Sequence, residues 1–224
     1  TVGLMWGRKL QGKDEVGLVG VGDGGASKGD FHAGLNFAGV LELPVVFLVF
    51  NNQWAISTPV EQQTAAETYA DRAKGYGFEG TLVDGNDVLA TYRATKRAIE
   101  SARNGDPMLL EALTYRRGAH SSSDADDYRE GADIEAWRER DPIDRYETFL
   151  VDRGILDPGD FDAIRAAAEE RAKEAAESAL EVAEAQSPEE VFDEVFANPP
   201  DYIDEQREEL MDLVERHGEA VFRW

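Results

Sequence analysis

The chain contains no cysteine, which excludes disulfide bonds, thiolate metal sites and a thiol nucleophile. No stretch approaches the roughly 20 consecutive apolar residues that a bilayer-spanning helix needs. The start of the chain also lacks a basic segment followed by an apolar signal core. We therefore expect a cytoplasmic protein with no membrane partner. Lysine is scarce, so arginine carries most of the positive charge; the lysines are Lys9, Lys13, Lys28, Lys74, Lys96 and Lys173.

The charge balance is strongly acidic, with a formal net charge of −23 over 224 residues. Because nucleic acids and anionic membranes are polyanions, this charge argues against binding either of them. An acidic, lysine-poor surface suits a cytoplasm of high salt, where the screening length falls to roughly 3 Å at 1 M. We therefore predict a halophilic origin, with an ordinary acidic bacterial protein as the alternative.

Apolar content of 42% allows one substantial core, or one core with a helical appendage. Strand-like apolar runs alternate with helix-like segments, which predicts an α/β fold: a parallel sheet with helices on both faces. Continuously apolar strands agree with this, because such strands are covered on both sides. The predicted strands are 16–21, 45–50, 78–83 and 107–114, and the predicted helices between them are 30–40, 65–76 and 88–103.

Later segments differ in character. Residues 53–64 are predicted to form a loop, and residues 116–131, rich in serine and aspartate, a longer one. Helices are predicted over 160–186 and 201–217. We expect an α/β domain over residues 1–150 and a C-terminal helical segment over 151–224 that docks on this domain or on a partner subunit. Residues 1–10 resemble the end of a helix and include no initiator Met, so we expect the N-terminal part of the domain to be missing.

Two short polar motifs end consecutive predicted strands: Gly22-Asp23-Gly24 and Asn51-Asn52. Each alone fits an ordinary turn. Together they place a carboxylate and an amide at the carboxyl edge of a parallel sheet, where ligands bind. Mg²⁺ prefers such oxygen ligands and leaves positions for phosphate oxygens, so a diphosphate site is predicted, with the carbonyl of Trp54 as a third ligand. Gly24 and Gly25 would let the backbone approach the phosphate.

These motifs and their surroundings resemble a known family. Gly22-Asp23-Gly24 followed by Asn51-Asn52 is similar to the signature of the thiamine diphosphate-dependent enzymes. The wider stretches 29–38, 51–59, 83–87 and 115–121 look like the alpha subunit of 2-oxoacid dehydrogenase decarboxylases, and the resemblance covers essentially the whole chain. The sequence Ala-Ile-Ser-Thr-Pro at 55–59 is more similar to the branched-chain members than to the pyruvate members.

The resemblance implies a thiamine diphosphate-binding fold in which Asp23, Asn52 and the carbonyl of Trp54 bind Mg²⁺. Gly24 and Gly25 would contact the diphosphate.

The resemblance also assigns roles in the 116–131 loop. It implies that His120 reaches the diphosphate and is the catalytic side chain of this chain. Ser121 matches a regulatory serine, and whether it is phosphorylated stays open. Asp124, Tyr128 and Arg129 match residues that order the loop, with a merely hydrated acidic loop as the alternative.

The implied activity is oxidative decarboxylation of a small 2-oxoacid, either branched-chain or pyruvate, with acyl transfer to a lipoyl group. The implied partners are a beta subunit, in an α2β2 heterotetramer without which the chain is inactive, and the lipoyl acyltransferase component. Acetoin dehydrogenase, a transketolase-like enzyme and a non-catalytic assembly subunit are the alternatives. Phe50 departs from relatives that carry a polar residue there.

The remaining rings are predicted to pack rather than to bind a cofactor. We expect this of His32, Trp137, Trp224, Phe192 and Phe196.

Overall fold

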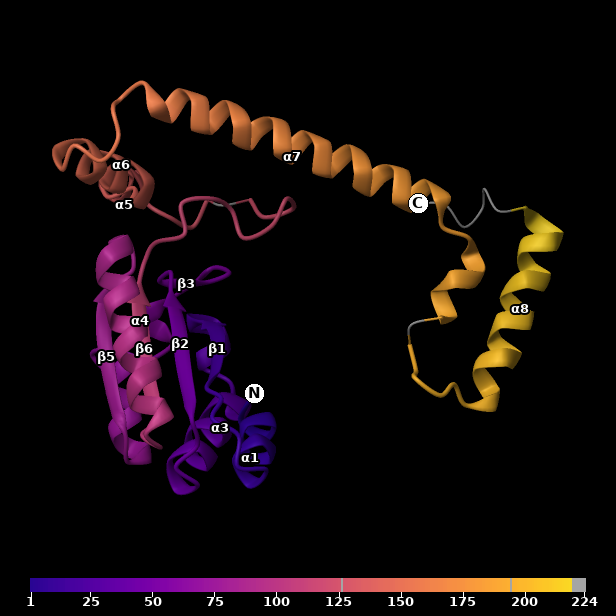
Figure 1. Ribbon diagram of the computed structural model, residues 1–224, viewed down its shortest axis with the longest axis horizontal. Coiled ribbons are helices and arrows are strands. Elements are labelled where there is room, and N and C mark those ends of the chain that lie inside the picture. The colour runs from indigo at the N-terminus through magenta and orange to yellow at the C-terminus, as the bar shows by residue number, and fades with distance from the viewer. Residues whose placement is uncertain (126, 194, 219–224) are drawn as a thin grey trace. The chain divides into compact units, whose positions relative to one another are not determined.

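The computed structural model describes residues 1–125, 127–193 and 195–218. The chain forms two compact units, Thr1–Leu156 and Asp157–Trp224, and each is described by itself (Figure 1). The predicted boundary at residue 150 lies within a helix of the first unit, Pro142–Asp152, and the two units separate six residues further along, after Leu156. Docking of the C-terminal helices stays a prediction.

The first unit is built on a four-stranded parallel sheet in the order β1-β2-β6-β5. The central strands β2 and β6 are buried almost throughout, as the predicted coverage on both sides requires. The edge strands β1 and β5 are less buried; exposure alternates along β1, and Leu18 and Leu82 remain about half exposed. The strands are β1 Gly17–Gly22, β2 Val45–Asn51, β5 Glu79–Asp84 and β6 Met108–Leu113.

Helices cover both faces of this sheet, as predicted. On one face the side chains of β2 pack against Leu35 and Ala38 of α3 and against Ala73 of η2. On the other face Val46 packs against Ala98 of α4. The helices are α1 Val2–Leu10, α2 Asp23–Ala26, α3 Gly29–Val40, η2 Ala70–Tyr76 and α4 Val88–Arg103.

Two local predictions were wrong. The predicted loop 53–64 contains a short hairpin, β3 Trp54–Ala55 with β4 Thr58–Pro59, and a turn of 3₁₀ helix, η1 Val60–Gln62. The predicted helix 65–76 is regular only in η2, a 3₁₀ helix that starts at Ala70. Side chains compete for its first amides, since the Thr68 hydroxyl accepts from the backbone N–H of Asp71 at 3.1 Å.

The described residues that follow β6, 114–125 and 127–130, form neither helix nor strand, in agreement with the predicted loop. Two helices follow that the sequence interpretation missed, α5 Gly131–Arg138 and α6 Pro142–Asp152. Asp141 caps α6 by accepting from the N–H of Ile143, and Pro142 occupies the first turn, where its missing N–H costs nothing.

The second unit consists of α7 Asp160–Ala185, η3 Pro188–Phe192 and α8 Asp201–His217, close to the predicted helices. Arg207 joins α8 to the segment around η3 through Asp193 at 3.0 Å, and its guanidinium lies 5.5 Å from the ring of Phe192. Side chains of α7 are exposed from residue 162 to 183.

Most of the rings singled out above have packing contacts. His32 Nδ1 lies 2.6 Å from the hydroxyl of Tyr76, and Trp137 stacks on Tyr115 with centroids 5.6 Å apart. Phe196 meets Tyr202 edge to face. Trp224 lies outside the described residues. No helix in the described part of the chain has both the length and the apolar character needed to cross a bilayer.

Candidate functional site

Asp23 is a buried carboxylate at the start of α2, directly after β1, and it is 2% exposed. The side-chain amide of Gln63 donates to its Oδ2 at 2.8 Å. Among the residues that the structure describes, no ion pair includes Asp23. Buried charges are normally paired or bound to a metal, so this carboxylate suits a divalent cation.

Asn52 and Trp54 follow β2 at the same edge of the sheet as Asp23, because the parallel strands β1 and β2 are in register. Gly22 of β1 is paired with Phe50 of β2, so the residues that follow leave the sheet side by side. The Oδ1 of Asn52 accepts from the backbone N–H of Trp54 at 3.0 Å. An amide oxygen has two acceptor positions, which leaves one for a metal. The structure therefore brings the three predicted ligands to one edge of the sheet.

This donor set is mixed. Within the described ranges, no group of three or more His, Asp or Glu side chains gathers as a metal site. One carboxylate, one amide and one backbone carbonyl still match the oxygen chemistry of Mg²⁺, which usually keeps phosphate or water oxygens in its remaining positions.

Gly24 and Gly25 have a packing reason as well as the predicted contact with a diphosphate. A Cβ on Gly24 would lie 2.8 Å from the Cβ of Ala55, and one on Gly25 would lie 2.6 Å from Cγ2 of Val21. Both distances are below those of real carbon contacts, so the glycines let α2 approach β3 and β1 closely. The contact with a diphosphate stays a prediction.

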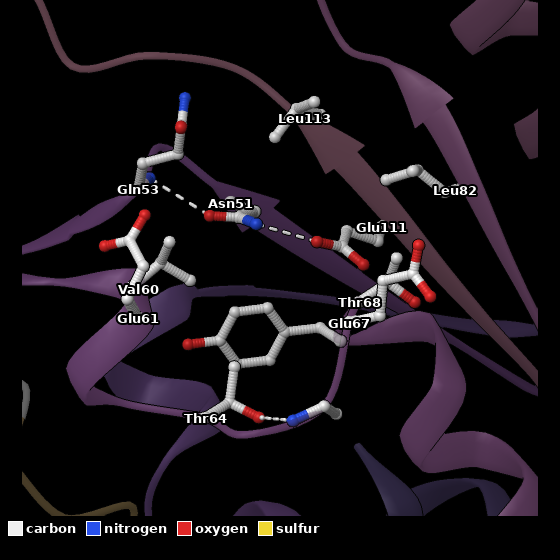
Figure 2. A pocket seen from close by; sticks show the side chains of 12 residues that line it. Asn51, Gln53, Val60, Glu61, Thr64, Glu67, Thr68, Leu82, Glu111 and Leu113 are labelled. Atoms are coloured by element: carbon white, nitrogen blue, oxygen red, sulfur yellow. Dashed lines mark hydrogen bonds between the residues drawn. The ribbon is translucent and has the colours of Figure 1, made fainter.

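Asn51 points toward Glu111 in a buried polar cluster (Figure 2). Its Nδ2 donates to Oε1 of Glu111 at 2.7 Å, and its Oδ1 accepts from the N–H of Gln53 at 3.0 Å. The second oxygen of Glu111 accepts from the N–H of Ala70 at 2.9 Å. Glu111 is 1% exposed, so the cluster is held in a low-dielectric environment where such bonds are strong.

Asp23 is linked to a second set of contacts, which come from the segment between β4 and η2 that carries Gln63 and Tyr69. The amide of Gln63, which binds Asp23, also donates to the carbonyl of Thr58 and accepts from the hydroxyl of Tyr69 at 3.3 Å. Tyr69 is fully buried. Burial raises the pKa of its hydroxyl, and the nearby charge of Asp23 acts in the same direction while Arg72 opposes it. Tyr69 is therefore a neutral donor at neutral pH.

A cavity of about 370 Å³ lies next to this cluster (Figure 2). Its walls include Glu61, Glu67 and Glu111, which disfavour an anion. Among the described residues that line it, neither Asp23 nor Asn52 is present. This cavity therefore does not coincide with the predicted diphosphate site at Asp23, which stays a prediction.

His120 is exposed in the loop after β6. Its backbone N–H donates to Oδ2 of Asp124 at 2.8 Å. In the described part of the chain, no contact joins its imidazole to Asp23, Asn52 or Trp54. Across the residues described, the structure shows no direct contact between this predicted residue and the predicted metal ligands.

The loop is nevertheless attached to the turn that carries Trp54. The ring of Tyr128 lies 5.4 Å from the ring of Trp54, and its hydroxyl donates to Oδ2 of Asp124 at 2.5 Å. Arg116 donates to the Tyr128 hydroxyl and to the carbonyl of Ile56. Arg129 is buried and donates to the carbonyls of Arg116 and Arg117. These contacts support the predicted ordering role of Asp124, Tyr128 and Arg129.

Sequence reasoning missed four residues of the site region: Gln63, Tyr69, Glu111 and Arg116. One signal was present for Glu111, because it is a lone charge inside the apolar strand β6. A buried charge in a central strand needs partners, which marks it as part of a polar cluster. Gln63 and Tyr69 carried no such signal, because their partners are distant in the sequence.

The model of the dehydrogenase E1 component family matches residues 1–188. Over 94% of its length the chain is 41% identical to the 3-methyl-2-oxobutanoate dehydrogenase subunit alpha of Mycobacterium tuberculosis, of which it covers 58%. It is also 41% identical, over 93% of its length, to the pyruvate dehydrogenase E1 component subunit alpha of Bacillus subtilis, of which it covers 57%. The 2-oxoisovalerate dehydrogenase subunit alpha of B. subtilis is 43% identical over 70% of this chain, which covers 48% of that relative. The chain thus spans about half the length of the curated relatives it matches.

Proposed function

This chain belongs to the dehydrogenase E1 component family, and on that premise we propose that it is the thiamine diphosphate- and magnesium-binding part of the alpha subunit of a 2-oxoacid dehydrogenase. The complete enzyme would decarboxylate a 2-oxoacid oxidatively and transfer the acyl group to a lipoyl group. The names of the relatives support this class of substrate. The chain is equally identical to relatives named for pyruvate and for 3-methyl-2-oxobutanoate. The sequence at 55–59 favours the branched-chain acids as substrates.

One observation carries the proposal. Asp23 is buried at a strand end without an ion pair among the described residues, and the amide oxygen of Asn52, which accepts from Trp54, follows the neighbouring strand at the same edge of the sheet. A carboxylate held in this way costs stability unless a cation binds it. We therefore expect binding of Mg²⁺ and the diphosphate to stabilise the folded protein by compensating the buried charge of Asp23.

The residues of this chain would bind and orient the cofactor. Thiamine diphosphate, when bound, supplies the electron sink for decarboxylation. Asp23, Asn52 and the carbonyl of Trp54 would hold Mg²⁺, and Gly24 and Gly25 would leave room for the diphosphate.

His120 would reach the diphosphate from the loop that Tyr128 attaches to Trp54. An imidazole carries an N–H in either tautomer, so His120 would donate to a phosphate oxygen or to the reacting end of the cofactor.

The partners belong to the same proposal. We expect a beta subunit in an α2β2 heterotetramer, a lipoyl acyltransferase component and a cytoplasmic location. A halophilic origin predicts that folding requires molar salt. If Ser121 is phosphorylated, about two negative charges would be added next to the loop bonds of His120 and Asp124, which would loosen the loop.

The test is co-expression of the full-length subunit with its beta subunit, followed by decarboxylation assays with thiamine diphosphate and Mg²⁺. Pyruvate, branched-chain 2-oxoacids, 2-oxoglutarate and acetoin form the substrate panel. The variant Asp23→Ala should abolish activity, whereas Asp14→Ala, at an exposed carboxylate, should retain it. Unchanged activity of the Asp23→Ala complex would favour a non-catalytic assembly role, and turnover of acetoin alone would favour an acetoin-cleaving enzyme.

A further inference from the structure

We propose that Glu111 is a positioning residue for the magnesium and diphosphate site, acting through Asn51 and the backbone of the segment that carries Gln63. This inference rests on the proposed function and deepens it. Glu111 lies on β6, in register with Val49 of β2, so its side chain shares a sheet face with Val49 and with Asn51 two residues later. Its carboxylate therefore lies beneath the turn that presents Asn52.

The two oxygens of Glu111 hold two different parts of the site. Oε1 accepts from Asn51, whose own Oδ1 accepts from the N–H of Gln53, and this fixes the turn from Asn51 through Asn52 to Gln53. Oε2 accepts from the N–H of Ala70, which fixes the end of the segment that follows Gln63. Figure 2 shows the first bond joining β2 to β6 across the cluster.

The Gln63 segment leads back to the other metal ligand. Tyr69 precedes Ala70 and donates to Oε1 of Gln63, while Nε2 of Gln63 donates to Asp23. Hydrogen bonds therefore link Asp23 to Tyr69 and link Ala70 through Glu111 to Asn51, the neighbour of Asn52, and the peptide bond between Tyr69 and Ala70 joins the two sets. Partners of this kind orient ligands, and their loss typically lowers metal affinity about 10–100-fold.

The chemistry requires an acceptor at both oxygens of residue 111. A Glu111→Gln side chain offers one oxygen and one NH₂ group, so either Asn51 or Ala70 meets a donor instead of an acceptor. A flip of the Asn51 amide would satisfy the glutamine but would turn an NH₂ group toward the N–H of Gln53. The single variant therefore leaves one buried donor without an acceptor in every arrangement.

Exchange of the two groups restores every bond. In the double variant Asn51→Asp with Glu111→Gln, the new aspartate accepts from Gln53 and from the NH₂ group of the new glutamine. The glutamine oxygen then accepts from Ala70. The number of buried charges and the number of hydrogen bonds are the same as in the native cluster. A difference in binding between the double variant and the wild type therefore cannot come from a change in buried charge.

The experiment uses the complex of the full-length subunit with its beta subunit, titrated calorimetrically with Mg²⁺ in the presence of saturating thiamine diphosphate, so that the Kd reports metal affinity. We expect Glu111→Gln to raise the Kd about tenfold or more, and the double variant to return it close to the wild-type value. Val46→Ala serves as the matched control, because it opens the core on the opposite face of β2; it should lower the unfolding temperature and leave the Kd unchanged.

Three results would overturn the inference. These are a wild-type Kd in Glu111→Gln, a double variant that binds no better than Glu111→Gln, and a Val46→Ala complex whose Kd rises as much as that of Glu111→Gln. If the wild-type complex itself shows no Mg²⁺-dependent binding, the proposed function fails, and the positioning role falls with it. The wild-type titration separates these two failures.

Discussion

Gly24→Ala tests how closely α2 must approach the β3 turn. The added Cβ would lie 2.8 Å from the Cβ of Ala55, so about 0.7 Å of movement is needed to reach a normal carbon contact of about 3.5 Å. Such overpacking costs about 1–3 kcal/mol, while replacing a glycine in an allowed conformation returns about 0.4–1 kcal/mol through the unfolded state. We expect a net loss of about 1–2 kcal/mol in the free energy of unfolding.

Ala55→Gly supplies the matching change. Alone it should cost about 0.5–1 kcal/mol, because a glycine in a strand loses more conformational entropy. Combined with Gly24→Ala it removes the clash, so the double variant should have nearly the wild-type stability, where additive effects would give a loss of about 1.5–3 kcal/mol. Denaturant unfolding of the four metal-free proteins measures this coupling, and additive losses would refute the reasoning.

The same four proteins test the predicted diphosphate contact separately. If the diphosphate lies against Gly24, the double variant regains stability but still binds thiamine diphosphate more weakly than the wild type. Full recovery of both quantities would show that Gly24 serves packing alone.

Two further predictions concern the loop after β6 and the start of α6. Tyr128→Phe keeps the ring beside Trp54 but removes the hydroxyl that bonds Arg116 and Asp124, so limited proteolysis near His120 should speed up about tenfold while the melting temperature changes little; unchanged cleavage would contradict this. The bond from the N–H of Ile143 and the nearby Arg117 hold the pKa of Asp141 below its usual value. The folded pKa is thus below the unfolded value of about 3.9, so this group's contribution to stability is complete above pH 3.9 and is lost as the pH falls through the lower folded value. Hydrogen exchange of the first α6 amides, relative to those of α4, should report that loss, and Asp141→Ala should remove the pH dependence.

Much of the first unit could be predicted from the sequence because its signals are local. Apolar runs bounded by turn residues identify β2 and β6, and Asp87 marks the start of α4 by accepting from the N–H of Ala90. The segment 65–76 was predicted as a helix because its composition suits one. Its actual conformation depends on side-chain acceptors, Thr68 nearby and Glu111 on a distant strand, which periodicity does not report.

In the site, too, some residues have local sequence signals and others are placed only by tertiary contacts. Asp23 and Asn52 could be found because each directly follows an apolar strand, and the parallel register then places both at the same edge of the sheet. Glu111 and Gln63 are linked to them only by tertiary contacts, across 60 residues for Asn51 with Glu111 and 40 residues for Asp23 with Gln63. His120 was assigned through a family resemblance, and its geometry toward the ligands depends on a loop held by Tyr128 and Arg116, which only the folded chain specifies.

The most direct test of the central claim is the melting temperature of the full-length complex with and without Mg²⁺ and thiamine diphosphate, for the wild type and for Asp23→Asn. Asparagine keeps the shape and the acceptor for Gln63 but removes the buried charge. The metal-free Asp23→Asn complex should be at least as stable as the wild type, and it should gain nothing from the ligands that stabilise the wild type. Equal ligand stabilisation of both proteins would contradict the assignment of Asp23 as the residue that binds the magnesium ion.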